Sequence, residues 1–224
     1  LRGLDYRVLQ GDPEVEIREL CYDSRRVRES SAFIAIKGFK VDGHDFIPQA
    51  LDNGATAVIV EKETDLPLGV TGVIVKDTRE ALGLLGANFY NHPSQSLGVI
   101  GVVGTNGKTT STYLVRSILM AAGHKVGVMG TIKSLIGDVE IATERTTPEG
   151  LDLQELLARM AEQGVDHAIM EVSSHAIALK RTAGCDFKGG IFTNITQDHL
   201  DFHGTFQEYL NVKARFFKEL DPLA

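Results

Sequence analysis

The chain has 224 residues, of which 43% are hydrophobic and 24% charged, and its formal net charge is −7. This composition predicts a globular protein of one large or two small domains. The negative charge argues against a nucleic-acid partner bound by bulk electrostatics. No apolar run approaches the roughly 20 residues of a membrane span and no signal peptide opens the chain, so we expect a cytoplasmic protein without membrane insertion. Cys21 and Cys185 are isolated, which predicts packed, unpaired thiols.

Residues 1–90 carry the pattern of a small α/β domain. Short apolar, β-branched runs predict strands at 20–27, 33–36, 57–62 and 72–77. Longer runs with helical spacing predict helices at 46–54 and 78–90. The polar, turn-rich segment NHPSQS follows and predicts a linker into a second domain.

Residues 91–224 alternate predicted strands with predicted helices. The strands are expected at 97–103, 125–132, 166–172 and 189–195, and the helices at 108–122, 148–164 and 206–220. This alternation predicts a doubly wound, mostly parallel sheet of the P-loop type, in which ligands bind at the carboxyl ends of the strands.

The stretch GVVGTNGKTT lies between the first strand and first helix of this second domain. It lacks the leading glycine of the usual pattern G-x-x-x-x-G-K-[ST], because Val102 stands in that place. The physical parts of a phosphate site are nevertheless present: Gly104 and Gly107 bracket the turn, Lys108 can reach a phosphate and Thr109 can ligate Mg²⁺ at the positive end of a helix. The alternative is a tight turn with an incidental glycine and lysine, which would not require Lys-Thr-Thr at the helix start.

Polar side chains also follow the later strands. Glu171 ends one strand in MEVSSH, with His175 near it, where a Mg²⁺ beside the phosphates would sit; the alternative is a surface carboxylate. The segment TNITQDHLDFHG follows the next strand and crowds together Asp198, His199, Asp201 and His203. For His203 we favour a simple role in capping the turn that follows.

Two further positions have ordinary structural interpretations. Thr147 followed by Pro148 is typical of a helix N-cap with proline at the first helical position, and a second anion site there is an added hypothesis. Lys213 can lie on the solvated face of an amphipathic helix whose apolar side is Leu210, Phe216 and Phe217.

At this point the chain resembles a known family, the Mur ligases. GVVGTNGKTT, TTPEG, MEVSSHA, TNITQDHLDFHGTFQEY and the lysine of NVKARFF occur there in this order, and DSRRV, FIAIKG and DGHDFI match the first domain. The resemblance covers nearly the whole chain. It accounts for the phosphate loop, because the family uses the shorter form G-T-N-G-K-[ST]. It also implies that the family's third domain, which binds the diamino acid, is missing and that the ATP domain is cut short, so we expect the chain alone to be inactive.

The resemblance implies roles for individual residues. ATP would be bound by Gly104, Thr105, Asn106, Gly107, Lys108, Thr109 and Thr110. Mg²⁺ would be held by Thr109, Glu171, His199 and Lys213, the last as an N6-carboxylated (carbamylated) lysine, and Lys108, Glu171, His199 and Lys213 would be catalytic. The UDP-sugar substrate would be contacted by Tyr22, Ser24, Phe39, Lys40, Val41, Thr146, Thr147, Ser173 and Arg181. Arg145 and Leu179 depart from residues that some members carry, so their roles stay open.

The implied reaction is amide synthesis. ATP would phosphorylate the side-chain carboxylate of UDP-N-acetylmuramoyl-L-alanyl-D-glutamate, and the amine of a diamino acid, meso-diaminopimelate or L-lysine, would attack the acyl phosphate. We expect a monomer. Three alternatives remain: a related ligase of the folylpolyglutamate synthase type, a P-loop kinase, and a nucleotide-binding module without catalysis.

Overall fold

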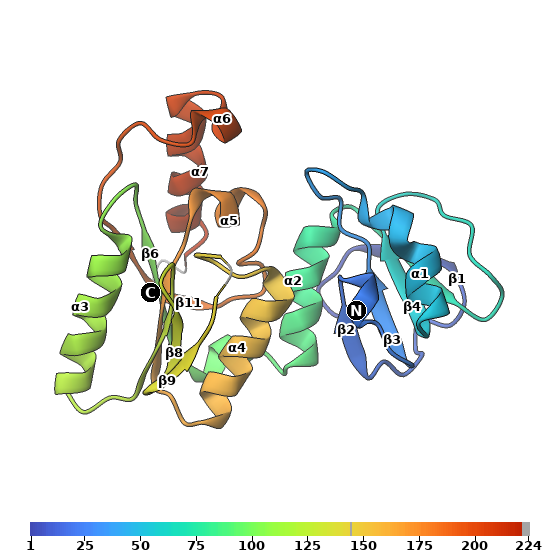
Figure 1. Ribbon diagram of the computed structural model, residues 1–224, viewed down its shortest axis with the longest axis horizontal. Coiled ribbons are helices and arrows are strands. Elements are labelled where there is room, and N and C mark those ends of the chain that lie inside the picture. The colour runs from blue at the N-terminus through green and yellow to red at the C-terminus, as the bar shows by residue number, and fades with distance from the viewer. Residues whose placement is uncertain (144, 221–224) are drawn as a thin grey trace. The chain divides into compact units, whose positions relative to one another are not determined.

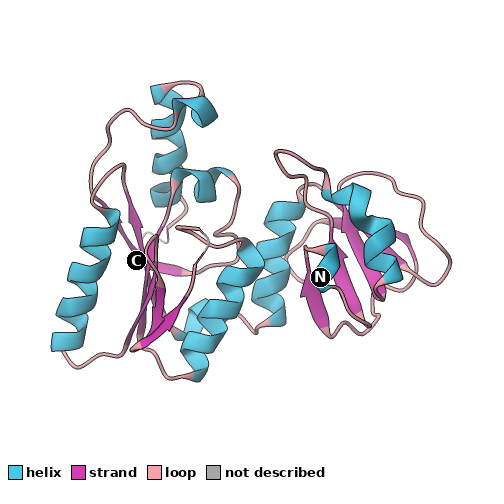
Figure 2. Ribbon diagram, in the orientation of Figure 1, coloured by secondary structure: helices cyan, strands magenta, loops and turns pink. Residues whose placement is uncertain are grey.

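The computed structural model describes residues 1–143 and 145–220. It separates into two compact units, Leu1–Leu85 and Gly86–Ala224. Each unit contains one mostly parallel sheet with helices beside it, which confirms the predicted α/β class (Figure 2). Among the described residues, no helix combines the length and the apolar character needed to cross a membrane.

The first unit is built on a five-stranded sheet in the order β1-β5-β4-β3-β2, in which only the β1–β5 pairing is antiparallel. Its strands are β1 (Tyr6–Gln10), β2 (Glu19–Cys21), β3 (Ser31–Ile34), β4 (Ala55–Val60) and β5 (Thr71–Val75). The helical segments are η1 (Ser24–Arg26), η2 (Gly43–Phe46), α1 (Ile47–Asp52) and α2 (Thr78–Phe89), the last extending into the second unit. Buried side chains of β3, β4 and α1, including Phe33, Val58 and Ile47, form its core.

One prediction for this unit was wrong, and one element was not predicted. The strand expected at 20–27 ends at Cys21, because the Asp23 carboxylate accepts a hydrogen bond from Arg25 N at 3.0 Å and starts the 3₁₀ turn η1. The edge strand β1 was not predicted, because its residues are exposed or half-buried and therefore lack an apolar run.

The second unit is built on a six-stranded sheet in the order β11-β6-β10-β7-β8-β9. Its strands are β6 (Gly98–Val103), β7 (Val126–Met129), β8 (Ser134–Ile136), β9 (Val139–Ile141), β10 (His167–Glu171) and β11 (Phe187–Phe192). Its helices are η3 (Pro93–Ser96), α3 (Lys108–Ala121), α4 (Gly150–Glu162), α5 (Ser174–Ala178), α6 (Leu200–His203) and α7 (Phe206–Lys218). The strands β11, β6, β10 and β7 are parallel, whereas β8 and β9 add an antiparallel extension that was not predicted.

Helices α3 and α4 lie on opposite faces of this sheet, as expected for a doubly wound domain (Figure 1). Leu153 and Leu157 of α4 and Phe216 of α7 pack on strand residues such as Val99 and Met170 in the main core. The strand register aligns Glu171 with Val102, and Phe192 with Val103. The segments that follow β6, β10 and β11 therefore meet at one edge of the sheet, where the ligand was expected.

Candidate active site

The loop after β6 presents the start of α3 to this edge. Gly107 precedes the helix with φ of 81°, a left-handed conformation that glycine adopts without strain, and Lys108 is the first helical residue. The first N–H groups of a helix have no partner within the helix and carry partial positive charge. The N-terminus of α3 therefore offers backbone donors to an anion, as the sequence predicted for a phosphate.

Lys108 lies folded over the loop. Its Nζ donates to the carbonyl oxygens of Gly104 and Thr105, both at 2.9 Å. Burial lowers the pKa of Lys108, and the carboxylates of Glu171 and Asp198 oppose that shift. The lysine is thus held next to the phosphate loop with two carboxylates in electrostatic range.

Glu171 is only 1% exposed, so the alternative of a surface carboxylate is wrong. The Thr109 hydroxyl lies 3.0 Å from both of its carboxylate oxygens. Thr131 donates its backbone N–H to Oε1 at 3.0 Å and its hydroxyl to Oε2 at 3.1 Å. A Cβ at Gly130 would clash with Glu171 Oε1, so this position leaves room for the carboxylate only because it is glycine. The resulting cluster of hydroxyl and carboxylate oxygens has the chemistry that Mg²⁺ prefers.

Lys213 is also 1% exposed, so the alternative of a solvated helix face is wrong. Its Nζ donates to Gly104 O at 2.7 Å and lies 4.7 Å from the centre of the Tyr209 ring. Burial is the main cause that lowers the pKa of Lys213 to about 8, with Lys108 adding to the shift and Asp198 opposing it. A buried amine that loses its proton this readily is a candidate for chemistry rather than for surface solvation.

The segment after β11 contacts the predicted phosphate loop, and one of the contacting residues, Asn194, was not singled out in the sequence. Asn194 accepts from Asn106 N at 3.0 Å and donates to Asn106 O at 3.1 Å, so its amide contacts both sides of that residue. Its backbone oxygen accepts from Thr105 N at 3.1 Å. The signal that could have identified Asn194 is its position: Thr193 and Asn194 follow directly after β11, the strand that pairs with β6.

The histidines form a separate cluster beside the loop. His199 has φ of 51° and stacks edge-on against His175, with ring centres 4.8 Å apart. A ring nitrogen of His203 lies 2.9 Å from Ser174 Oγ, and Thr205 caps α7, so the expected capping role of His203 was wrong. Within the described ranges, no group of three or more His, Cys, Asp or Glu side chains is arranged to hold a metal ion. The role of His199 as a magnesium ligand therefore stays a prediction.

Thr147 does not cap α4, contrary to expectation. That helix begins at Gly150, and Glu149 occupies the N-cap position. The buried Thr147 hydroxyl instead donates to Glu171 O at 2.8 Å and accepts from Ser173 N at 3.2 Å. This tertiary contact ties the predicted substrate residues Thr147 and Ser173 to the strand end that carries Glu171.

A second feature missed in the sequence is the buried carboxylate of Glu149. Its Oε1 lies 2.9 Å from Arg181 Nη2 and 3.1 Å from Arg145 Nη1, so one oxygen bridges two guanidinium groups. Arg181 also donates to Thr147 O at 3.3 Å. Thr146, another predicted substrate residue, contacts Thr131 through their hydroxyls at 3.1 Å. Hydroxyl and cationic groups suited to an anionic substrate therefore lie next to the Glu171 cluster.

In the first unit, the predicted substrate residues occupy two settings. Phe39, Lys40 and Val41 form the exposed apex of a tight turn. Ser24 is buried, and its hydroxyl donates to Gln49 Oε1 at 2.7 Å; Tyr22 is half-buried.

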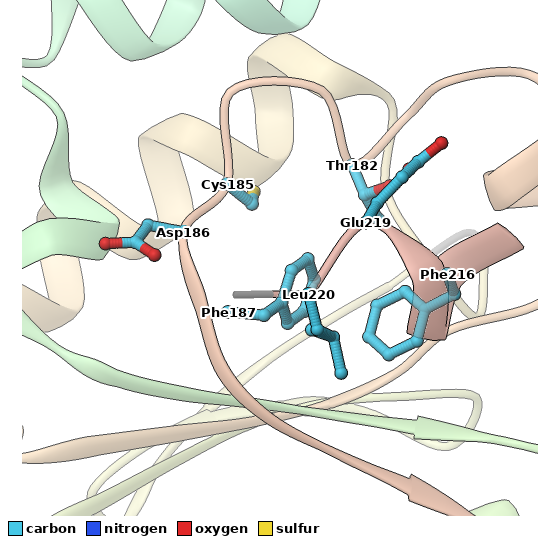
Figure 3. A pocket seen from close by; sticks show the side chains of 7 residues that line it. All are labelled: Thr182, Cys185, Asp186, Phe187, Phe216, Glu219 and Leu220. Atoms are coloured by element: carbon cyan, nitrogen blue, oxygen red, sulfur yellow. The ribbon is translucent and has the colours of Figure 1, made fainter. Parts of the chain in front are cut away.

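A cavity of about 500 Å³ lies near the end of α7 (Figure 3). Figure 3 shows Phe187, Phe216 and Leu220 close together, whereas Asp186 points away from them. The described lining also includes Glu219, Thr182 and Cys185 and contains no lysine or arginine. Burial raises the pKa of the Cys185 thiol to about 12. The described part of the lining therefore offers no cationic side chain to a phosphate, and the thiol of Cys185 stays protonated.

Together, the fold and the loop have the features of a nucleotide-binding α/β domain of the P-loop type. Comparison with known proteins gives the family. A profile of the Mur ligase middle domain matches residues 102–223, and one described as the Mur ligase family catalytic domain matches residues 16–90. The chain belongs to the Mur ligase family.

Two curated relatives are diaminopimelate ligases by name. The chain is 45% identical over 218 residues to the UDP-N-acetylmuramoyl-L-alanyl-D-glutamate–2,6-diaminopimelate ligase of Clostridium perfringens, covering 97% of this chain and 45% of that protein. It is 49% identical over 213 residues to ligase 1 of the same name from Clostridium acetobutylicum, covering 95% and 44%. The chain thus spans about half the length of these curated relatives.

Two solved structures with a similar fold are also Mur ligases by title. A structure titled UDP-N-acetylmuramoyl-L-alanyl-D-glutamate–2,6-diaminopimelate ligase superposes with a TM-score of 0.78 at 33% identity, covering 90% of this chain and 41% of that one. The MurF ligase of Thermotoga maritima, solved with ADP, superposes with a TM-score of 0.63 at 26% identity, covering 94% and 45%.

Proposed function

We propose that the chain provides the UDP-substrate-binding and ATP-binding parts of a ligase that adds 2,6-diaminopimelate to UDP-N-acetylmuramoyl-L-alanyl-D-glutamate. The observation that carries this proposal is the contact of Thr109 with the buried Glu171 carboxylate, directly beside the loop on which Lys108 and Lys213 converge. The names of the relatives favour diaminopimelate over lysine as the added residue.

The residues of the chain match the electrostatic demand of this reaction. Bringing a substrate carboxylate against a triphosphate places like charges together, so cationic groups must neutralise them while the site fixes the geometry of attack. The N-terminus of α3 would bind the phosphates, and Lys108 would move from the loop carbonyls to the β- and γ-phosphates. Thr109 and Glu171 would hold Mg²⁺, which, when bound, stabilises charge on the transferring phosphoryl group.

The substrate carboxylate would be oriented by the groups around Thr147. Arg181 is fixed by the buried Glu149 carboxylate and by Thr147 O, and Thr147 itself is bonded to the backbone of Glu171. A peptide held by Arg181, Thr147 and Ser173 would therefore lie next to the metal ligands. That proximity is what transfer of a phosphoryl group to the peptide's carboxylate requires.

Lys213 would act as a carbamate. Its neutral amine would attack CO₂, forming an N–C bond and releasing one proton, and the cationic side chain would become an anionic oxygen ligand for Mg²⁺. The burial of Lys213 and its pKa of about 8 support this modification, because both increase the fraction of neutral amine.

In the first unit, the turn of Phe39, Lys40 and Val41, together with Tyr22 and Ser24, would bind the UDP end of the substrate. Calorimetric titration of the Ser24→Ala variant with the UDP substrate tests this part. If Ser24→Ala bound the UDP substrate as tightly as the wild type, Ser24 would not be one of the residues that bind it.

The nucleotide site is tested by Lys108→Ala, with the exposed Lys218→Ala on α7 as the matched control. We expect Lys108→Ala to lose at least about tenfold in Mg·ATP affinity by calorimetry, because charge-assisted contacts to phosphate contribute about 1.5–3 kcal/mol. Lys218→Ala should bind like the wild type. A Lys108→Ala variant within twofold of the wild type would contradict the assignment of the loop.

A further inference from the structure

The turn that carries Phe39, Lys40 and Val41 is closed by backbone contacts at its base. Gly38 N donates to Val41 O, and Gly43 N donates to Ile36 O, both at 2.9 Å. At the apex, Phe39 is 73% exposed and Val41 is 59% exposed. The turn therefore presents two large apolar side chains to solvent.

Below this turn lies a histidine to which neither the sequence nor the family motifs assigned a role. The side chain of His44 is buried, and its Nδ1 lies 2.6 Å from Asp42 Oδ1. Its Nε2 accepts a hydrogen bond from Glu61 N at 3.1 Å. A backbone N–H can only donate, so Nε2 carries no proton, and the proton of a neutral imidazole must sit on Nδ1, directed at Asp42.

The ring therefore joins the turn to the end of β4. Asp42 belongs to the base of the turn, and its Oδ1 also accepts from His44 N at 3.0 Å. Glu61 follows β4, and its carboxylate accepts from Thr78 N and Thr78 Oγ1, both at 2.8 Å, at the start of α2. A chain of hydrogen bonds thus runs from α2 through Glu61 and His44 to the turn.

The charged groups around the ring are few. Asp42 faces Nδ1, and Lys62 Nζ lies 3.4 Å from Asp42 Oδ2. The Glu61 carboxylate is directed at Thr78 rather than at the ring. Nε2 meets the backbone N–H of Glu61, so a proton added there would replace an attractive contact by a repulsive one between two donors.

We propose that His44 is a positioning residue for the UDP site: its neutral ring clamps the 38–41 turn to β4, and protonation at Nε2 releases the turn and weakens substrate binding. The inference rests on the proposed function, in which this turn contacts the UDP end of the substrate. A histidine that merely filled the core would contribute to stability, but substrate affinity would not follow its protonation.

The test is calorimetric titration of the full chain with UDP-N-acetylmuramoyl-L-alanyl-D-glutamate at about pH 8 and about pH 5.5, a range that spans histidine titration. The wild type and His44→Gln are compared, because the glutamine amide oxygen can accept the Glu61 N–H but does not take up a proton in this range. The exposed His124→Gln in the second unit is the matched control.

We expect the wild type and His124→Gln to lose at least about tenfold in affinity at the lower pH, and His44→Gln to change by less than about threefold. An equal loss in His44→Gln, or no loss in the wild type, would overturn the role of His44. Absence of binding by the wild type at about pH 8 would instead overturn the proposed UDP site itself.

Imidazole ¹⁵N NMR of the wild type keeps the proposal testable if His44→Gln does not fold. We expect an unprotonated Nε2 and a protonated Nδ1 for His44 at about pH 8, with protonation on acidification accompanying loss of the ligand. An Nε2–H tautomer, or protonation of His44 while the ligand stays bound, would overturn the clamp.

Discussion

The side-chain amine of Lys213 donates to the carbonyl oxygen of Gly104 at 2.7 Å, although the two residues lie 109 positions apart in the sequence. Lys108 Nζ donates to the same oxygen at 2.9 Å. One loop carbonyl is therefore the shared partner of two lysines from α3 and α7. This arrangement places both amines beside the phosphate loop, and it brings them close enough for Lys108 to lower the pKa of Lys213.

The first prediction concerns the modification of Lys213. With ¹³C-labelled bicarbonate we expect a carbamate resonance in the wild type that is absent from Lys213→Ala. In a ligation assay of a full-length protein that joins this chain to the remaining sequence of the Clostridium acetobutylicum ligase, Lys213→Ala should lose turnover far more than Mg·ATP affinity, and acetate should partly restore turnover by supplying the missing carboxylate oxygens. Full turnover of Lys213→Ala, or identical ¹³C spectra of the two proteins, would refute the carbamate.

The second prediction concerns the two-sided contact between Asn194 and Asn106. Asn194→Ala removes both hydrogen bonds to the loop, each worth about 1 kcal/mol. We therefore expect Mg·ATP affinity to fall by about tenfold or more in calorimetry, while UDP-substrate affinity is retained. Asn211→Ala, at an exposed position on α7, is the control and should match the wild type. Equal nucleotide affinities in the two variants would show that Asn194 does not position the loop.

The third prediction concerns the carboxylate that bridges two arginines. Glu149→Gln removes a buried charge that holds Arg181, so we expect substrate affinity to drop by about tenfold, with Mg·ATP affinity changed less than twofold. Glu162→Gln, exposed near the end of α4, serves as the control. A parallel loss of both affinities would indicate general damage to the unit rather than a role in orienting Arg181.

The fourth prediction concerns acid stability. The backbone N–H of His44 is the main cause that lowers the pKa of Asp42 to about 2, and the His44 ring and Lys62 add to the shift against the effect of burial. Because the folded-state pKa lies below the ordinary value of 3.8, the carboxylate stabilises the fold above about pH 4, and this contribution disappears as the pH falls through about 2.

Asp42→Asn should therefore lower the free energy of unfolding by up to about 2 kcal/mol at neutral pH and by progressively less in acid. Chemical denaturation between about pH 2 and pH 7 measures this, with the exposed Asp65→Asn as the control. A difference between Asp42→Asn and the wild type that stays constant across the range would contradict the assignment.

The features that could be predicted from the sequence are those set by residues that are consecutive in the chain. The phosphate loop follows from a strand, two glycines and a helix start in a row, and Glu171 follows from its place at the end of an apolar strand. Parallel strands bring such positions to one edge, so their proximity could be expected before the structure was known.

The features that sequence missed depend on contacts between distant segments. The spacing of Leu210, Phe216 and Phe217 placed Lys213 on the polar side of α7, yet the side chain is buried and its amine lies over the Tyr209 ring and reaches Gly104 O. Thr147 has the local pattern of a cap, but the hydrogen bond to Glu171 O takes its hydroxyl instead. Secondary-structure propensity and residue spacing describe one segment by itself. Contacts with distant segments override them at sites such as Lys213 and Thr147.

The most direct test of the proposed reaction follows oxygen from the substrate. The D-glutamyl side-chain carboxylate of UDP-N-acetylmuramoyl-L-alanyl-D-glutamate is labelled with ¹⁸O, and Mg·ATP and diaminopimelate are added. Since the chain spans about half the length of its relatives, the protein used joins it to the remaining sequence of the Clostridium acetobutylicum ligase. Activation of the carboxylate by phosphoryl transfer predicts one ¹⁸O in the inorganic phosphate for each amide formed. Amide formation with unlabelled phosphate, or ADP release that does not depend on the UDP substrate, would contradict the account.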